Sequence, residues 1–361
     1  LKLEFGHVVG SRIRLSGLSE NMEVAIKLYE NMLLGAVGDD TILENLKKDI
    51  IKGRSDNKKS QSSCFSALQT YLFYGPEYIQ KRVLSNDTIL SFRSDEILSA
   101  VKDVLDKGHE ILYYGPMKTG DLEGVLKGSH HVAEGAEILP ERHDEVLQTP
   151  ESKVFLAQYD AKQLYYMQYS NRGETFDPFE AAGINMYNEY FGGGMNAIVF
   201  QEMREARGLA YSASATLATP NYNTEDFYKY IAVIATQNDK MRSAIEAFDS
   251  IINDMPESEA AFQIAKEAII GRMRTSRTTG MNVLRLYQSC RRLGLGEPMN
   301  KQVFHDLQTL ELNDVVKVQQ KWVKDRTYQY AILGDIKDLD TKYLSTLGPV
   351  KVLTLEDIFG Y

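Results

Sequence analysis

The sequence has few of the residues that usually carry covalent or metal chemistry, and it lacks a long apolar run. Its two cysteines, Cys64 and Cys290, lie far apart, which argues against a disulfide framework and against a cysteine-based zinc site. We expect both to be spectator thiols in the core. No segment approaches the roughly 18 uninterrupted apolar residues that a membrane-spanning helix needs. The sequence therefore predicts a fold held by ordinary hydrophobic cores.

Motifs of a complete active site are missing as well. The histidines are His7, His109, His130, His131, His143 and His305. None of them forms the zinc motif His-x-x-Glu-His or His-Glu-x-x-His, and the nearest approach, from His131, has Gly135 in place of the second ligand. At His130, His131 and Glu134 we expect adventitious metal binding at most. A phosphate-binding P-loop and a nucleophilic Gly-x-Ser-x-Gly elbow are also absent.

Acidic residues outnumber basic ones. The net charge of −9 argues against nucleic acid as a partner, since such a partner requires a basic face. A length of 361 residues with 43% hydrophobic content favours two or three domains. Because Leu1 is neither an initiator methionine nor the start of a signal peptide, we expect a piece of a longer polypeptide. We expect a soluble protein, whose compartment, periplasm or cytoplasm, the sequence leaves open.

The most informative stretch is residues 190–216. It opens with a glycine-rich loop made of Gly192, Gly193 and Gly194. Asn196 belongs to the residue types that cap helix N-termini, and Gly208 stands where helices commonly close with a left-handed residue. An apolar stripe between them is formed by Val199, Met203 and Ala206. The pattern predicts a loop, a helix capped by Asn196, and a stop at Gly208.

A strand is predicted directly after this helix. One side of it would carry Leu209, Tyr211, Ala213, Ala215 and Leu217. A reversal of the chain at Gly208 brings Arg204 and Tyr211 together, and such a pair can donate hydrogen bonds to a carbonyl or to the oxyanion it becomes. Spacing by itself favours the simpler interpretation, in which Tyr211 is a core tyrosine and Arg204 a surface arginine.

The run from Gly192 to Ala215, GGGMNAIVFQEMREARGLAYSASA, resembles a signature of the pitrilysin/insulinase family of zinc metallopeptidases. That family includes the mitochondrial processing peptidases and the respiratory-complex core proteins. There, an Arg and a Tyr seven positions later belong to the non-catalytic half and contact the substrate at the scissile bond. The resemblance assigns this role to Arg204 and Tyr211, whereas Arg207 has the wrong spacing. It also implies that zinc and the general base belong to a partner half, fused or separate.

An internal repeat spans much of the chain. Like residues recur at a constant offset of 219 positions: Ala25 with Ala244, Ile26 with Ile245, Ile50 with Ile269, Gly75 with Gly294, and Gly115 with Gly334. We therefore predict a duplicated α/β unit. Residues 153–160 and 164–170 alternate as a hairpin, and 178–191 is a predicted helix. Their counterparts would precede position 1, so the first unit is expected to be truncated at its N-terminus.

These observations predict an α+β protein of two duplicated α/β sandwich units, each a mixed or antiparallel sheet packed with helices. We expect the truncated first unit over 1–127, a polar linker over 128–152, and the complete second unit with the Arg/Tyr motif over 153–361. Strands at 109–114 and 328–333 would correspond in the two units. The resemblance further implies the LuxS/MPP-like metallohydrolase fold.

Two functions stay open. The first is the non-catalytic half of a zinc peptidase, which encloses a peptide substrate and directs Arg204 and Tyr211 to the backbone near the scissile bond; alone, it would hold no catalytic zinc and cleave nothing. The alternative is a structural subunit of the core-protein type. An independent hydrolase would need a metal or nucleophile that the sequence lacks. Solvated helix faces, rather than a chamber wall, are expected for Arg272, Arg274, Arg277, Arg285, Arg291 and Arg292.

Overall fold

The computed structural model describes residues 2–7, 11–138, 144–220 and 223–361. The chain divides into two compact units. The first contains Leu1–Arg54 and Leu84–Asp144, and the second contains Ser55–Val83 and Glu145–Tyr361. Within the described ranges, no helix is long and apolar enough to cross a membrane.

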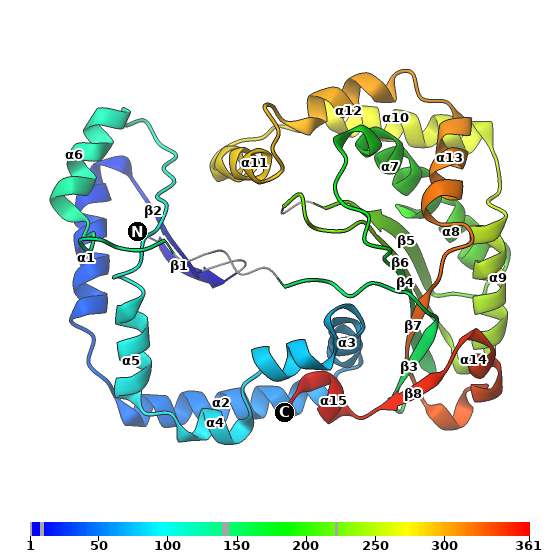
Figure 1. Cartoon of the computed structure of the whole chain (residues 1–361), viewed down its shortest axis with the longest axis horizontal. Coiled ribbons are helices and arrows are strands. Elements are labelled where there is room, and N and C mark those ends of the chain that lie inside the picture. Colours follow the sequence, from blue (N-terminus) through cyan, green and yellow to red (C-terminus); the bar gives the residue numbers. More distant parts are fainter. Residues whose placement is uncertain (1, 8–10, 139–143, 221–222) are drawn as a thin grey trace. The chain divides into compact units, whose positions relative to one another are not determined.

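A six-stranded mixed sheet forms the centre of the second unit (Figure 1). Its strands are β3 (Lys153–Gln158), β4 (Gln163–Ser170), β5 (Ser212–Ala218), β6 (Lys229–Gln237), β7 (Gln329–Gly334) and β8 (Val350–Leu353). The order across the sheet is β5-β6-β4-β7-β3-β8. β3 runs parallel to both of its neighbours, and the remaining pairs are antiparallel. The predicted class, a mixed sheet packed with helices, is confirmed for this unit.

The predicted hairpin of β3 and β4 is wrong. β7 lies between them, so that Ile332 is opposite Leu156 on one side and Tyr166 on the other. All six residues of β7 are buried, as in a strand covered on both faces. Alternation in β3 and β4 shows that each strand has a buried face, but it does not tell which strand will be its neighbour.

One face of the sheet packs against a layer of helices (Figure 1). These are α7 (Ala181–Tyr187), α9 (Met241–Asn253), α10 (Glu259–Thr275), α12 (Met299–Leu307) and α13 (Leu312–Trp322). In α9 the side chains of Met241, Ala244, Ile245 and Phe248 recur at helical spacing and are all buried. Phe248, Phe262 and Trp322 belong to the same core.

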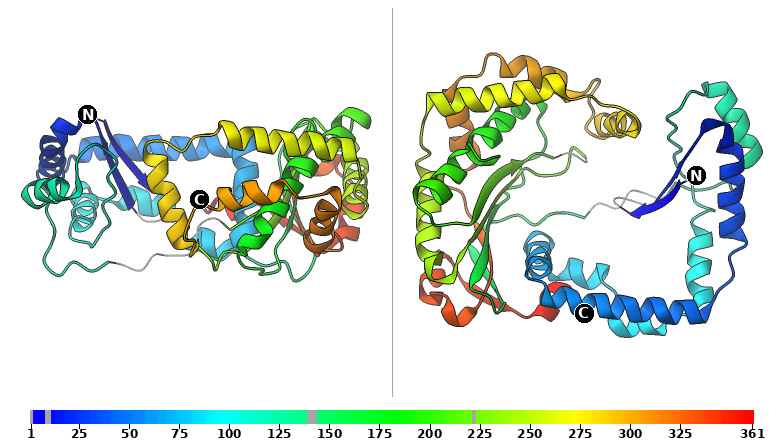
Figure 2. Two further views of the ribbon diagram at one scale, coloured as in Figure 1. Left: turned by 90° about the horizontal axis from the view of Figure 1, so that it is seen from above. Right: turned by 180° about the vertical axis from the view of Figure 1, so that it is seen from behind.

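The opposite face is covered by a segment from far earlier in the chain. Helix α3 (Gln61–Arg82) and the short α15 (Leu355–Phe359) pack there, as the right-hand view of Figure 2 shows for α3. Leu68 and Leu72 of α3 are buried in one cluster with Leu333 of β7. Cys64 is also fully buried in it, and burial raises the pKa of its thiol, as expected for a spectator.

Helix α3 is bent near its middle. Gly75 has a φ of 76°, in the left-handed region, and Pro76 follows it. Proline cannot donate the next helical hydrogen bond, so one helical piece ends here and a second begins.

The first unit is built mainly of helices. Strands β1 (Lys2–His7) and β2 (Ser11–Ser16) form an antiparallel pair. The helices are α1 (Met22–Leu34), α2 (Asp40–Lys59), α4 (Asn86–Ser91), α5 (Ser94–Asp103) and α6 (Thr119–Ser129). The predicted strand at 109–114 is not formed. Its counterpart β7 is held by β3 and β4, and the described part of the first unit has no equivalent of either.

The repeat is visible in the element bounds. Both ends of α1 and α9 differ by 219 positions, and so do the first residues of α2 and α10.

The remaining helices are α8 (Ile198–Phe200), α11 (Met281–Arg292) and α14 (Thr341–Leu347). The linker expected at 128–152 and the boundaries beside it stay a prediction.

Candidate functional site

The glycine loop before the Arg/Tyr motif lies directly against strand β5. A π-helical turn, Asn188–Gly192, carries the chain into the loop. A Cβ atom at Gly192 would lie 1.9 Å from the carbonyl oxygen of Ala215, and one at Gly193 would lie 2.7 Å from that of Asn188. At Gly194 a Cβ would meet nothing within 4 Å. Two of the three predicted loop glycines are therefore needed for close backbone approach.

The helix that carries Arg204 differs from its prediction in two ways. It starts at Ile198 after Ala197, without a side-chain cap, so the predicted cap at Asn196 is wrong. It then widens into a π-helical turn, Gln201–Ala206. A π turn holds an extra residue, which rotates Ala206 off the apolar face and leaves it exposed, while Met203 stays fully buried.

The turn at Gly208 brings Arg204 and Tyr211 together. Gly208 has a φ of 57°, the predicted left-handed conformation. The guanidinium carbon of Arg204 lies 5.7 Å from the ring centroid of Tyr211 and 5.0 Å from that of Phe200. Arg204 is therefore in cation–π contact with both rings.

Both predicted groups face solvent. Tyr211 precedes β5 and is 74% exposed, so the expectation that it lies on the buried side of the strand is wrong. The side chain of Arg204 is 45% exposed and its ion-pair partner is Glu205, at 3.7 Å. Exposed Met195 also lies in the loop before this helix. The guanidinium and the phenol keep hydrogen-bonding capacity for a ligand.

Two further side chains fasten the turn to the end of β6. Lys240 Nζ donates to the carbonyl oxygen of Gly208 at 3.1 Å, and Thr236 Oγ1 donates to that of Leu209 at 2.6 Å. These two residues and Phe200 were not predicted from the sequence. Phe200 stands four positions before Arg204, the spacing at which helix side chains meet, so its signal was present. The other two carried no local signal.

The free edge of β5 is closed at one end by a side chain. Asn188 Oδ1 accepts from the backbone N–H of Leu217 at 2.7 Å, and its Nδ2 donates to the carbonyl oxygen of Leu217 at 3.0 Å. The amide imitates a neighbouring strand, and Gly192 covers Ala215 beside it. A peptide therefore cannot extend this sheet along residues 215–217.

The glycine loop, the Arg204 helix and β5 all lie in the part of the chain that matches a known family model. Residues 123–269 match the model described as the peptidase M16 inactive domain. This segment is a peptidase M16 inactive domain. The resemblance drawn from residues 192–215 is thereby confirmed.

Solved structures share the fold. A peptidase M16 inactive domain from Pseudomonas fluorescens is 15% identical, with a TM-score of 0.63 over 92% of this chain and 81% of that chain. A conserved protein from Enterococcus faecalis is 13% identical, with a TM-score of 0.65 over 92% and 82%. The ferredoxin protease FusC, solved in complex with Arabidopsis ferredoxin, is 12% identical, with a TM-score of 0.64 over 92% of this chain and 37% of that chain. No curated protein sequence matches the chain.

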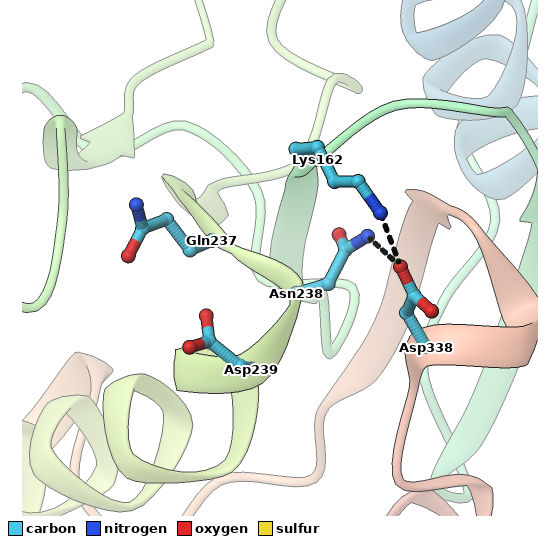
Figure 3. A pocket seen from close by; sticks show the side chains of 5 residues that line it. All are labelled: Lys162, Gln237, Asn238, Asp239 and Asp338. Carbon is cyan, nitrogen blue, oxygen red and sulfur yellow. Dashed lines mark hydrogen bonds and ion pairs between the residues drawn. The ribbon is translucent and has the colours of Figure 1, made fainter.

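A hollow of about 500 Å³ opens elsewhere in the second unit (Figure 3). Its lining is Lys162, Gln237, Asn238, Asp239 and Asp338. Asp338 accepts from Lys162 Nζ at 3.4 Å and from Asn238 Nδ2 at 3.5 Å. Neither Arg204 nor Tyr211 lines this hollow, and its charged groups largely satisfy one another. We therefore place the candidate site of the domain at the exposed Arg/Tyr pair.

The histidines do not assemble a metal centre in the described part of the chain, where no group of three His, Cys, Asp or Glu side chains could hold an ion. His130 instead contacts Glu30 and His109. His143, and the side chain of His7, lie outside the described residues. The described residues in and around positions 123–269 thus offer no such set of ligands.

The arginines of α10 include one with a defined partner. Arg272 binds both carboxylate oxygens of Glu189, at 3.1 and 2.6 Å, beside a hollow of about 250 Å³. This pair joins α10 to the π-helical turn that carries Asn188. Arg272 therefore has the local carboxylate partner that the sequence interpretation expected.

Proposed function

We propose that this chain is the non-catalytic half of an M16-type zinc peptidase, and that Arg204 and Tyr211 donate hydrogen bonds to a bound peptide's backbone near the scissile bond. A partner half, fused or separate, would supply the zinc ion and the general base. This chain's own part is to enclose the peptide and to present the two donors in fixed positions.

The observation that carries this proposal is the exposed, preorganised pair. Phe200 lies against the guanidinium, and the turn between the two residues is fastened by Lys240. A donor held in place before the reaction costs no reorganisation when negative charge develops, and removal of one such donor typically costs about 3 kcal/mol, or 100- to 1,000-fold in turnover. An arginine kept only for solubility would not need contacts with two aromatic rings.

The substrate class follows from the same groups. A guanidinium and a phenol can both donate to carbonyl oxygens, which every peptide offers regardless of sequence. The closed edge of β5 at Leu217 supports binding of the peptide's extended strand on the partner half. FusC, which shares this fold, was solved with a protein, ferredoxin. We therefore propose peptide segments of proteins as substrates.

Replacement of Arg204 by Ala in the enzyme assembled with its catalytic half tests this role. We expect kcat to fall by about 100-fold or more, because a transition-state donor is lost. Tyr211→Phe, which removes only the hydroxyl, should also lower kcat. Arg207→Ala is the matched control, since Arg207 lies in the same turn but pairs with Glu202 at 3.2 Å.

Equal turnover of Arg204→Ala and Arg207→Ala would reject the assigned role. It would favour the alternative, a structural subunit of the core-protein type, which shares the fold and needs no donors at this position. A peptide-cleavage assay on the isolated chain gives a second check: we expect no activity, and cleavage abolished by a chelator would contradict the proposal.

A further inference from the structure

Two histidine rings meet in the first unit, outside the candidate site. The Nε2 atoms of His109 and His130 lie 2.8 Å apart, and the rings meet edge to face. Nδ1 of His109 lies 2.9 Å from the carbonyl oxygen of Lys107. Nδ1 of His130 contacts the carboxylate of Glu30. All four ring nitrogens therefore have a partner.

These partners determine where hydrogen atoms must be. A carbonyl oxygen only accepts, so Nδ1 of His109 carries a hydrogen. The Glu30 carboxylate accepts from the backbone N–H of His131, at 2.9 and 3.0 Å, and with Glu30 ionised Nδ1 of His130 is the donor in their contact. Two neutral rings would then point two bare Nε2 lone pairs at each other. A separation of 2.8 Å between nitrogens requires a hydrogen between them.

We propose that His109 and His130 together hold one proton more than two neutral rings, that Glu30 balances its charge, and that this shared proton ties three segments of the first unit together. The segments are α1, which carries Glu30, the residues around His109, and the end of α6, which His130 follows. The arrangement is a proton-binding site of the first unit and does not depend on the proposed function.

Among the described residues, this proton is the positive charge that lies beside Glu30. In the described part of the chain, the ion-pair partner of Glu30 is His130. Tyr29 is adjacent, and its pKa is raised first by burial and then by the charge of Glu30. Cations on the packed elements have other partners: Lys27 binds Glu23, Lys127 binds Glu123, and Lys102 donates to the carbonyl of Ala36. Glu110 adjoins His109 in the chain, and Lys107 contributes its carbonyl.

Release of the proton would leave the two lone pairs facing each other across 2.8 Å. The segment around His109 should then separate from His130 once the rising pH has removed the proton. Two backbone amides report on this contact: His131 donates to Glu30, and Gly108 donates to the carbonyl of Glu137 at 2.9 Å. Their hydrogen exchange should accelerate when the contact opens.

Nitrogen-15 NMR of the ring nitrogens in the full chain tests the proposal. At pH 5.5 we expect three of the four nitrogens of the pair to lie in N–H···acceptor bonds, and on raising the pH both rings should change in one coupled transition. Exchange at Gly108 and His131 should rise about tenfold beyond the intrinsic pH effect, the factor for one lost hydrogen bond. His305, which is exposed, serves as the reference histidine.

His109→Gln is the diagnostic variant. A glutamine amide can donate to a neutral His130 Nε2 or accept from a protonated one, so the contact holds in both states. The pH dependence of exchange at the two amides should therefore disappear while the fold stays. His305→Gln should leave it unchanged. Two independent histidine transitions, or pH-dependent exchange that persists in His109→Gln, would overturn the proposal. Ring signals that change on addition of a chelator would also reject it, because a metal ion would then lie between the rings.

Discussion

At the scale of single residues, exposure decides what a side chain can do. Tyr211 alternates with buried neighbours in the sequence, yet it lies one residue before β5 and is 74% exposed. Arg204 was recognised from its motif, whereas Phe200, which stacks on it, was not. The roles of Arg204 and Tyr211 toward substrate stay a prediction, but their proximity follows from a turn whose glycine could be identified in advance.

Asp249 is a second residue whose chemistry depends on burial. It lies on α9 under the sheet, where burial raises the pKa of its carboxyl from 3.8 to about 6, although Gln168 donates to it at 3.3 Å. A carboxyl with a raised folded pKa disfavours folding when it ionises. Its cost is absent below pH 4 and complete above pH 6 to 7, so stability should fall as pH rises through this window.

Replacement of Asp249 by Asn removes this ionisation and keeps the shape of the side chain. We expect the variant to be more stable at pH 8 by roughly 2–3 kcal/mol, from a shift of about two pKa units, and equal to the natural chain near pH 3.5. Urea unfolding at both pH values measures this. Exposed Asp160→Asn is the control, and a gain of the same size there, or none for Asp249→Asn at pH 8, would contradict the argument.

At the scale of elements, close backbone contact places the site. The glycine loop and β5 touch so tightly that a side chain at Gly192 has no space, and the π-helical turns on either side of the loop shift the helix faces away from ideal periodicity. Hydrophobic periodicity assumes a regular helix and therefore predicted the face of Met203 correctly and that of Ala206 wrongly.

Gly192→Ala should separate the loop from β5. The added Cβ would lie 1.9 Å from a backbone oxygen, which cannot rotate away, so we expect a loss of about 2 kcal/mol or more in the free energy of unfolding. Gly194→Ala is the matched control, because a Cβ there meets nothing within 4 Å, and its effect should stay within about 0.5 kcal/mol. Thermal unfolding of both variants checks the pair; similar losses would show that the contact is not what constrains the loop.

At the scale of the molecule, chain order and spatial order differ. Residues 55–83 are embedded in sequence between two parts of the first unit, but α3 packs on the sheet of the second. The sheet that α3 covers could not be predicted from the sequence, because an apolar stripe shows that a helix is buried without identifying what covers it. The repeat, in contrast, was visible in the sequence, since a constant offset requires no knowledge of contacts.

Leu68→Ala tests the assignment of α3. Leu68 is fully buried, so its truncation should cost about 2–5 kcal/mol. Hydrogen exchange should accelerate in β7, which lies far along the chain, and leave α1 and α6 unaffected. Exposed Ser66→Ala is the control on the same helix. Loosening confined to the first unit would show that α3 belongs there instead.

The sequence by itself determined the duplicated pattern, the Gly208 turn and the Arg/Tyr motif, because each depends on local propensity or on residue identity. Only the tertiary structure decided that β7 separates β3 from β4, that α3 covers the far face of the sheet, and that Asn188 closes the edge of β5. Periodicity encodes which side of a segment is buried. Partner choice depends on shape and on hydrogen-bonding groups brought together from distant positions, and no local window contains them.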